Sequence, residues 1–387
     1  MKIGRLFTVS MLSVAALAIV PAAQNVVGQY RTFVDRAEAI RSVEAFGAIL
    51  SFAQHVVGHR APYISPLFQE TPATDAQLAA IAKIRQTADT SFAKAKAAVA
   101  ELSDGKSVGD GLAQAGAKLN DLRAITDPIL SRPLSARDQA IARGFLPGVS
   151  QVAATIDPIL DGLADRVAAT DASLTTLLNV ARTAQDLRIA AGGRAAALSP
   201  ALSARRQITP AEKAGMDRAL GRIETNRDRL QSGVQQLGNP QRLTAALKEA
   251  NEAYFGRANA VVDKEMATGQ GDANYSINAD QLAEIVVPAI EKFFVLRDAS
   301  IAEARDHAAA ARDSALTMLI IGVVIVAALI ALLAGVTLLL RRRVIAPVIA
   351  LTAVIGEMAR GHDDVAIPSS GRDDEISAMA GSLQTFK

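Results

Sequence analysis

The stretch from Leu316 to Leu340 constrains the fold of this chain more than any other feature. Its 25 residues carry no charge and are mainly Leu, Ile, Val and Ala. As a helix rising 1.5 Å per residue it would be about 37 Å long, enough to cross a hydrocarbon core about 30 Å thick. Arginines at 341–343 follow directly, and such clusters stay on the cytoplasmic side of a membrane. The sequence therefore predicts a transmembrane helix over 313–340, with the preceding segment exported.

The N-terminus carries a second apolar run. Lys2 and Arg5 precede apolar residues from Leu6 to Val20, and the run continues more weakly to Val27. A cleaved signal peptide fits the short apolar core and its small residues. A retained signal anchor fits if the helix continues past Pro21. We favour the anchor, with 1–5 in the cytoplasm and a helix over 6–28, because the helix at 313–340 then completes a coherent two-pass protein.

Composition and motifs argue against catalysis. Basic and acidic residues nearly balance, 41 against 39, so no nucleic-acid partner is indicated. The absence of cysteine excludes disulfides and thiolate chemistry. His55 and His59 lie four residues apart, which would place both on one helix face, but no HExxH pattern accompanies them. No P-loop or Ser-His-Asp arrangement is present. We expect no enzyme, no cofactor and no metal site.

The segment 29–312 is predicted to be all-helical and built from two related bundles. Residues 58–68 align without gaps on residues 192–202, with five of the eleven positions identical. Each copy is soon followed by a capping box, Thr74 to Gln77 or Thr209 to Glu212. We infer two four-helix bundles over about 29–155 and 156–312; chance similarity in an Ala-rich sequence is the alternative.

The last exported helix has an apolar seam that leads into the membrane span. Six residues alternate steps of four and three, the spacing of a coiled-coil face. No helix-breaking residue separates this seam from the span at 316–340. The sequence predicts one continuous helix that could carry a displacement across the bilayer. The six positions are Leu282, Val286, Ala289, Phe293, Leu296 and Ser300.

Two arginines at matching repeat positions are the candidate ligand-binding residues. Arg60 and Arg194 each lie near glycine and shortly before a Ser-Pro pair. A guanidinium near a helix end can hold a carboxylate or another oxyanion in a bidentate way, and His59 adds a donor in the first copy. We predict a small anionic ligand at Arg60, His59 or Arg194. The competing interpretation is that both arginines are solvated.

The tail at 341–387 contains two short amphipathic helices joined by a polar connector. Apolar residues in both helices step by three and four, and Val365 and Ile367 alternate within the connector. The tail resembles a HAMP domain, with Pro347 after the membrane exit, Gly361 closing the first helix and Glu375 opening the second. His362 departs from the Asp that often follows this glycine. The resemblance implies a parallel four-helix coiled coil made by two chains. Its packing positions would be Pro347, Leu351, Ile355, Met358, Gly361, Val365, Ile367, Glu375, Ile376, Met379 and Leu383.

Taken together, these features predict an all-α, two-pass receptor of the bacterial inner membrane. The exported part resembles, more weakly, the two-bundle helical sensor domains of chemoreceptors, including the nitrate- and nitrite-sensing type. We expect a homodimer with a periplasmic sensor and a HAMP relay to a downstream output, most simply the sensory part of a methyl-accepting chemoreceptor. The alternatives are the sensor half of a histidine kinase or cyclic-dinucleotide enzyme, and a structural two-pass protein without a ligand.

Overall fold

The computed structural model describes residues 3–362, 364–368 and 374–386. Most of the described residues are helical, and none of them lies in a strand, in agreement with the predicted all-α class. The chain divides into two compact units. We call Asp35–Arg312 the large unit, and Met1–Val34 with Asp313–Lys387 the small unit.

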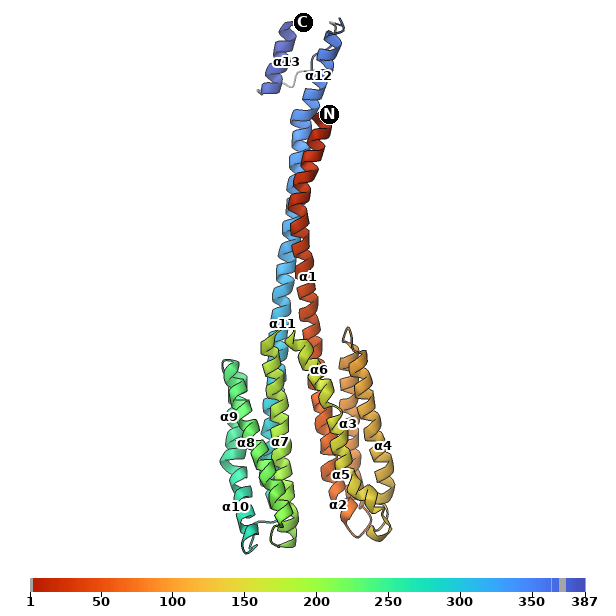
Figure 1. The fold of residues 1–387 in the computed structure, drawn as a ribbon, viewed down its shortest axis with the longest axis vertical. Coiled ribbons are helices and arrows are strands. Elements are labelled where there is room, and N and C mark those ends of the chain that lie inside the picture. The colour runs from red at the N-terminus through yellow and green to blue at the C-terminus, as the bar shows by residue number, and fades with distance from the viewer. Residues whose placement is uncertain (1–2, 363, 369–373, 387) are drawn as a thin grey trace. The chain divides into compact units, whose positions relative to one another are not determined.

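The large unit consists of two helical bundles (Figure 1). The first contains the end of α1 (Ile3–Gly58) and the helices that follow it. The second begins at α7 and includes the start of α11 (Ala279–Leu340). The remaining helices of the first bundle are α2 (Arg60–Phe68), α3 (Asp75–Ala100), α4 (Lys106–Leu130), α5 (Gln139–Ala154) and α6 (Asp157–Ala168). Those of the second are α7 (Ala172–Ala204), α8 (Pro210–Gln236), α9 (Gln241–Ala253), the π-helical turn Tyr254–Ala258 and α10 (Asn259–Gln270).

Helix α6 lies with the first bundle. Ile159 packs against Gly111 of α4, and Arg166 donates to the carbonyl of Asp104 at 2.8 Å. Helix α6 therefore contacts helices of the first bundle, and the module boundary near residue 155 stays a prediction. The interpretation of the two bundles as related modules stays a prediction.

Local capping explains why α3 and α8 begin where they do. The Thr74 hydroxyl accepts from the amide of Gln77 at 3.3 Å, and Gln77 accepts from the amide of Thr74 at 2.9 Å. Thr209 and Glu212 make the same reciprocal pair at 3.2 and 2.9 Å. Each pair satisfies amides that the first helical turn leaves without partners. Both predicted capping boxes are confirmed.

The core of the second bundle forms along the predicted seam of α11. All six seam residues, from Leu282 to Ser300, are buried. Phe293 meets Tyr254 edge-on at 5.8 Å between ring centroids, and the hydroxyl of Ser300 donates to the carbonyl of Leu177 at 2.7 Å. Burying such apolar area contributes about 25 cal/mol per Å², so this face of α11 is held firmly against its bundle.

The small unit contains the two apolar spans. Two helices are long and apolar enough to cross a membrane, one near the N-terminus and one within the α11 segment, and the most apolar window of each is unburied. Leu332, for example, is 63 % exposed, as expected for a side chain that faces lipid. The two spans lie side by side: a side chain added at Gly322 would collide with Gln29. After the π-helical turn Arg341–Ile345 come α12 (Ala346–Met358) and α13 (Glu375–Phe386).

Candidate functional site

His59 is a fully buried residue at the junction between α1 and α2. Its Nδ1 donates to the carbonyl of His55 at 2.8 Å, and its Nε2 lies 2.9 Å from a guanidinium nitrogen of Arg123. Arg123 is in turn paired with Asp89 at 2.7 Å. Burial, together with the charge of Arg123, lowers the pKa of His59 to about 4 despite the opposing backbone hydrogen bond. His59 is therefore neutral at pH 7 and committed to contacts inside the first bundle.

Arg194 is buried in the second bundle, with only 2 % of its surface exposed. Its guanidinium pairs with the carboxylate of Asp263 at 2.6 Å and donates to Asn259 at 2.8 Å, both on α10. An external anion would have to displace the Asp263 carboxylate. The repeat therefore does not place its two arginines in equivalent surroundings, and ligand binding by Arg194 stays a prediction.

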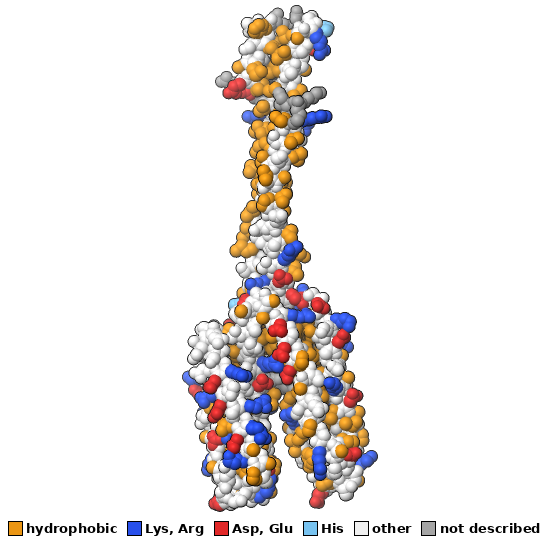
Figure 2. Space-filling view, in the orientation of Figure 1, with side chains coloured by type: hydrophobic (Ala, Val, Ile, Leu, Met, Phe, Trp, Pro, Cys, Tyr) orange, Lys and Arg blue, Asp and Glu red, His pale blue; other side chains and the backbone are white. Residues whose placement is uncertain are grey.

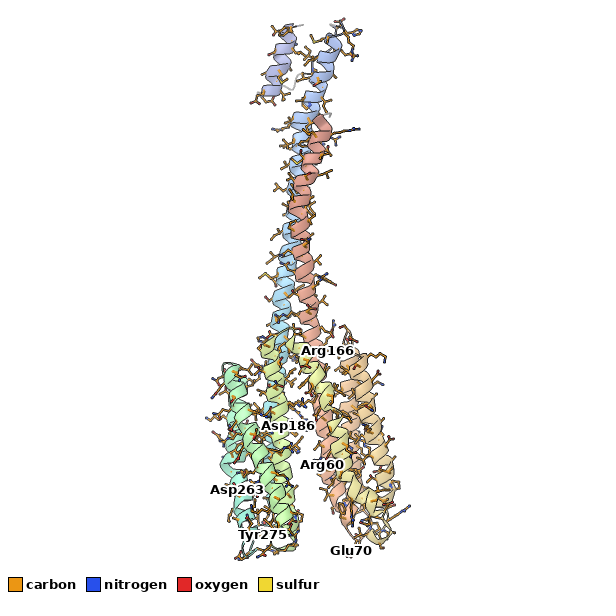
Figure 3. The ribbon with its side chains drawn as sticks, viewed as in Figure 1. Arg60, Glu70, Arg166, Asp186, Asp263 and Tyr275 are labelled. Carbon is orange, nitrogen blue, oxygen red and sulfur yellow. The ribbon has the colours of Figure 1, made fainter. Side chains whose placement is uncertain are left out.

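Arg60 lies at the start of α2, on the flank of the first bundle that faces the second (Figure 3). It donates to the hydroxyl of Ser150 on α5. Its Nε is buried and has no hydrogen-bond partner among the described residues. Of the three predicted ligand-binding residues, Arg60 lines a large open cavity.

That cavity, which we call the inter-bundle groove, lies between the two bundles of the large unit (Figure 2). Its volume is about 1190 Å³. The first bundle contributes residues of α1, α2, α3 and α5, and the second contributes residues of α7 and α11. The small residues Gly192, Gly193, Ala195 and Ala196 form part of the α7 wall, so this wall leaves room for a ligand.

Arg188 and Phe294 also line the groove, and the sequence analysis did not single them out. The Arg188 guanidinium lies over the Phe294 ring at 4.9 Å, and Arg297 lies over the same ring at 4.6 Å. Arg188 is one helical turn before Gly192 and therefore on the same face of α7. That spacing is the signal that could have identified it.

A second cluster, the Asp171 clamp, ties together the helices that continue into the small unit. The Asp171 carboxylate caps α7 by accepting from the amide of Ser173 at 2.9 Å. It also accepts from Arg36 of α1 at 3.1 Å and lies 3.2 Å from Nε2 of His307 of α11. Burial opposes ionisation of this carboxyl, but the hydrogen bonds from Ser173, Arg36 and His307 outweigh it and hold its pKa at about 2.

In the tail, Gly361 ends the first helix in the left-handed conformation expected of it, with a φ of 87°. The amides of Gly361 and His362 reach back to the carbonyls of Met358 and Glu357 at 3.0 and 3.3 Å, which is the Schellman pattern. A residue with a Cβ adopts this φ only at a cost.

The predicted HAMP packing positions differ in exposure within one chain. Leu351 is buried, whereas Ile355 and Met379 are exposed. Gly361 and Glu375 are exposed as well. The half-buried positions are Pro347, Met358, Val365, Ile367, Ile376 and Leu383. Their role in a two-chain coiled coil stays a prediction.

Comparison with known protein families identifies a domain in the tail. Residues 339–387 match the family model of the HAMP domain. This match, with the two apolar helices, indicates a transmembrane signalling receptor that passes twice through the bacterial inner membrane. Comparisons of the chain with curated proteins and with solved structures found no match.

The Asp171 clamp gives a prediction about stability and pH. Folding lowers the pKa of Asp171 from 3.8 to about 2. The ionised carboxylate therefore stabilises the folded state above about pH 4, and this contribution is lost as the pH falls through about 2. We expect Asp171→Asn to lower the melting temperature by a few degrees at pH 7 and by less at pH 3. Thermal unfolding of the full chain in nanodiscs, followed by circular dichroism, measures the difference.

Asp110→Asn is the matched control, because Asp110 forms an exposed pair with Lys106 on a single helix. Such pairs contribute little to stability, so this variant should melt like the wild type at both pH values. An equal deficit for Asp171→Asn at pH 7 and pH 3 would show that the carboxylate charge is not what stabilises the clamp.

Proposed function

We propose that the chain is the sensory part of a bacterial chemoreceptor, in which the large unit lies in the periplasm and binds a small ligand. One observation carries this proposal: α1 and α11 each contribute side chains to the core of the large unit and also contain an apolar span. A change in the packing of the large unit therefore acts on the same two helices that enter the membrane.

The proposed mechanism is a shift between two packings of α11. Ligand binding in the large unit would move the seam of α11 by about 1–2 Å or rotate it slightly. The displacement would pass along the helix to the HAMP domain and change the populations of its two packing states. The Asp171 clamp supports this mechanism, because it links α1, α7 and α11 through one carboxylate.

The HAMP match supports a relay to a downstream output. We propose a chemotaxis output, because the two-bundle helical architecture resembles that of chemoreceptor sensor domains. A histidine kinase or a cyclic-dinucleotide enzyme would use the same relay. Fusion of residues 1–387 to each type of output domain would distinguish them by which fusion responds to the ligand.

The first prediction of this proposal concerns topology. A reporter enzyme that is active only after export, inserted at Gly238 between α8 and α9, should be active in cells because the large unit is periplasmic. Gly238 has a φ of 78° in a turn and no neighbouring atom within 4 Å of an added Cβ, so an insertion there should be tolerated. The same reporter fused after Phe386 should be inactive. Activity of a cytoplasmic reporter at Gly238 would reject the proposed topology.

The second prediction concerns assembly. If two chains pair through the first HAMP helix, single cysteines at Val348 and Leu351 should form disulfides between chains in oxidised membranes. A cysteine at Ala353 is the control, since it is exposed and lies about 200° around the helix from Leu351. Gel electrophoresis without reductant measures the crosslinked fraction. Equal crosslinking at all three positions would contradict a specific parallel pair.

The third prediction concerns the relay. Ile367 is half-buried while its neighbour Ala366 is exposed, so Ile367→Asp would bury a charge or force the connector away from the helices. In a chimera with a known output domain, we expect Ile367→Asp to hold that domain in one signalling state, so that its activity no longer depends on ligand. The matched variant Ala366→Asp should respond like the parent chimera. A normal response from Ile367→Asp would count against a HAMP-type connector.

A further inference from the structure

The inter-bundle groove concentrates polar groups that have no partner. The Nδ1 of His55, the Nε of Arg60 and the Nε of Arg188 are buried and make no hydrogen bond with any described residue. All three residues line this one groove. A buried polar group without a partner costs free energy, and here three such groups lie around a cavity that a ligand could enter.

The positive charge of the groove is only partly compensated. No described residue makes a hydrogen bond or ion pair with Arg188. Burial lowers the pKa of its guanidinium, the negative charge of Glu291 opposes this shift, and the positive charge of Arg297 adds to it. Arg297 has its own partners, Asp298 at 2.7 Å and Gln185 at 3.1 Å. Glu291 is the single acidic residue among the described residues that line the groove. Because Arg60 and Arg188 also line the groove, its net charge is positive.

The walls of the groove are apolar. Ile64 of α2 and Val287 of α11 are 43 % and 42 % exposed, and both line the groove. With about 1190 Å³, the groove matches or exceeds the pockets that hold drug-sized molecules. A nitrate ion would satisfy an arginine and leave these walls in water, whereas a ligand with an apolar body would cover them.

We propose that the inter-bundle groove binds a small carboxylate with an aromatic or branched apolar body. The carboxylate pairs with Arg188, with Arg60 as a second donor, and the apolar body packs between the two bundles. This inference rests on the proposed sensor function and names the class of its ligand. It also places the ligand on α11, because Val286 and Ile290 belong both to the groove wall and to the buried face of this helix.

The test uses the full chain in nanodiscs and isothermal titration calorimetry. The probes are 3-phenylpropionate, benzoate and 4-methylpentanoate. The comparison molecules are 3-phenylpropan-1-ol, which lacks the charge, and nitrate, which lacks the apolar body. We expect saturable binding of at least one carboxylate probe, and binding at least tenfold weaker for the alcohol and for nitrate. Tenfold corresponds to about 1.4 kcal/mol.

Two variants test the groove by different means. Arg188→Gln removes the positive charge while keeping a polar, though shorter, side chain, and should weaken carboxylate binding at least tenfold. Ala196 is exposed on the α7 wall, so Ala196→Trp should block the groove without disturbing the core. Arg143→Gln is the matched control, since Arg143 is exposed on α5 and does not line the groove; its affinity should equal that of the wild type. Circular dichroism of each variant checks folding, and Arg188→Lys should recover part of the lost affinity.

Several outcomes would overturn the inference. They are binding of no carboxylate probe, equal binding of nitrate, and carboxylate binding that survives both Arg188→Gln and Ala196→Trp. Light scattering adds another: dissociation of a dimer by Ala196→Trp would show that a second copy of the chain occupies the groove. The topology and relay experiments do not involve this groove, so they can support the sensor function even where the groove assignment fails.

Discussion

The hydrocarbon core of the membrane is the constraint on which this structure depends. Only a segment whose backbone hydrogen bonds are satisfied internally can cross it, and this chain meets that requirement with two helices. The same helices do not end at the membrane boundary of their apolar spans. Helix α1 contributes Phe46 and Ile49 to the core of the large unit, and α11 contributes Phe293 and Leu296. The large unit is therefore assembled around two helices that also contain the apolar spans.

Arginine has two different roles in the large unit, and the partners of each guanidinium distinguish them. Arg123 and Arg194 are buried and paired with Asp89 and Asp263. Removing one member of such a pair leaves a buried charge without compensation, so these arginines hold helices together. Arg188 is partly buried and forms no ion pair with a described residue, although the charge of Glu291 acts on it. A structural arginine is thus one whose guanidinium pairs with a carboxylate of the protein, and a candidate binding residue is one whose guanidinium does not.

The tail shows how little sequence is needed to define a relay element. The positive φ of Gly361 terminates α12, and the Asp374 carboxylate accepts from the amide of Ser377 at 2.9 Å at the start of α13. Between them, Val365 and Ile367 are half-buried while Ala366 is exposed. Helix ends and the alternation of the connector are local properties, which is why a segment of this length can be recognised as a HAMP domain without help from the rest of the chain.

The sequence by itself determined what depends on near neighbours along the chain. Both capping boxes, the buried seam of α11, the two spans and the HAMP tail follow from spacing, helix period and hydropathy, and the structure agrees with each. Only the tertiary structure decided which groups surround Arg60 and Arg194. Arg194 pairs with Asp263 and Arg60 lines the inter-bundle groove because helices distant in sequence pack beside them. No local sequence pattern specifies which helices pack together. The repeat made the two arginines look equivalent, but long-range packing gave one a carboxylate and left the other beside a cavity.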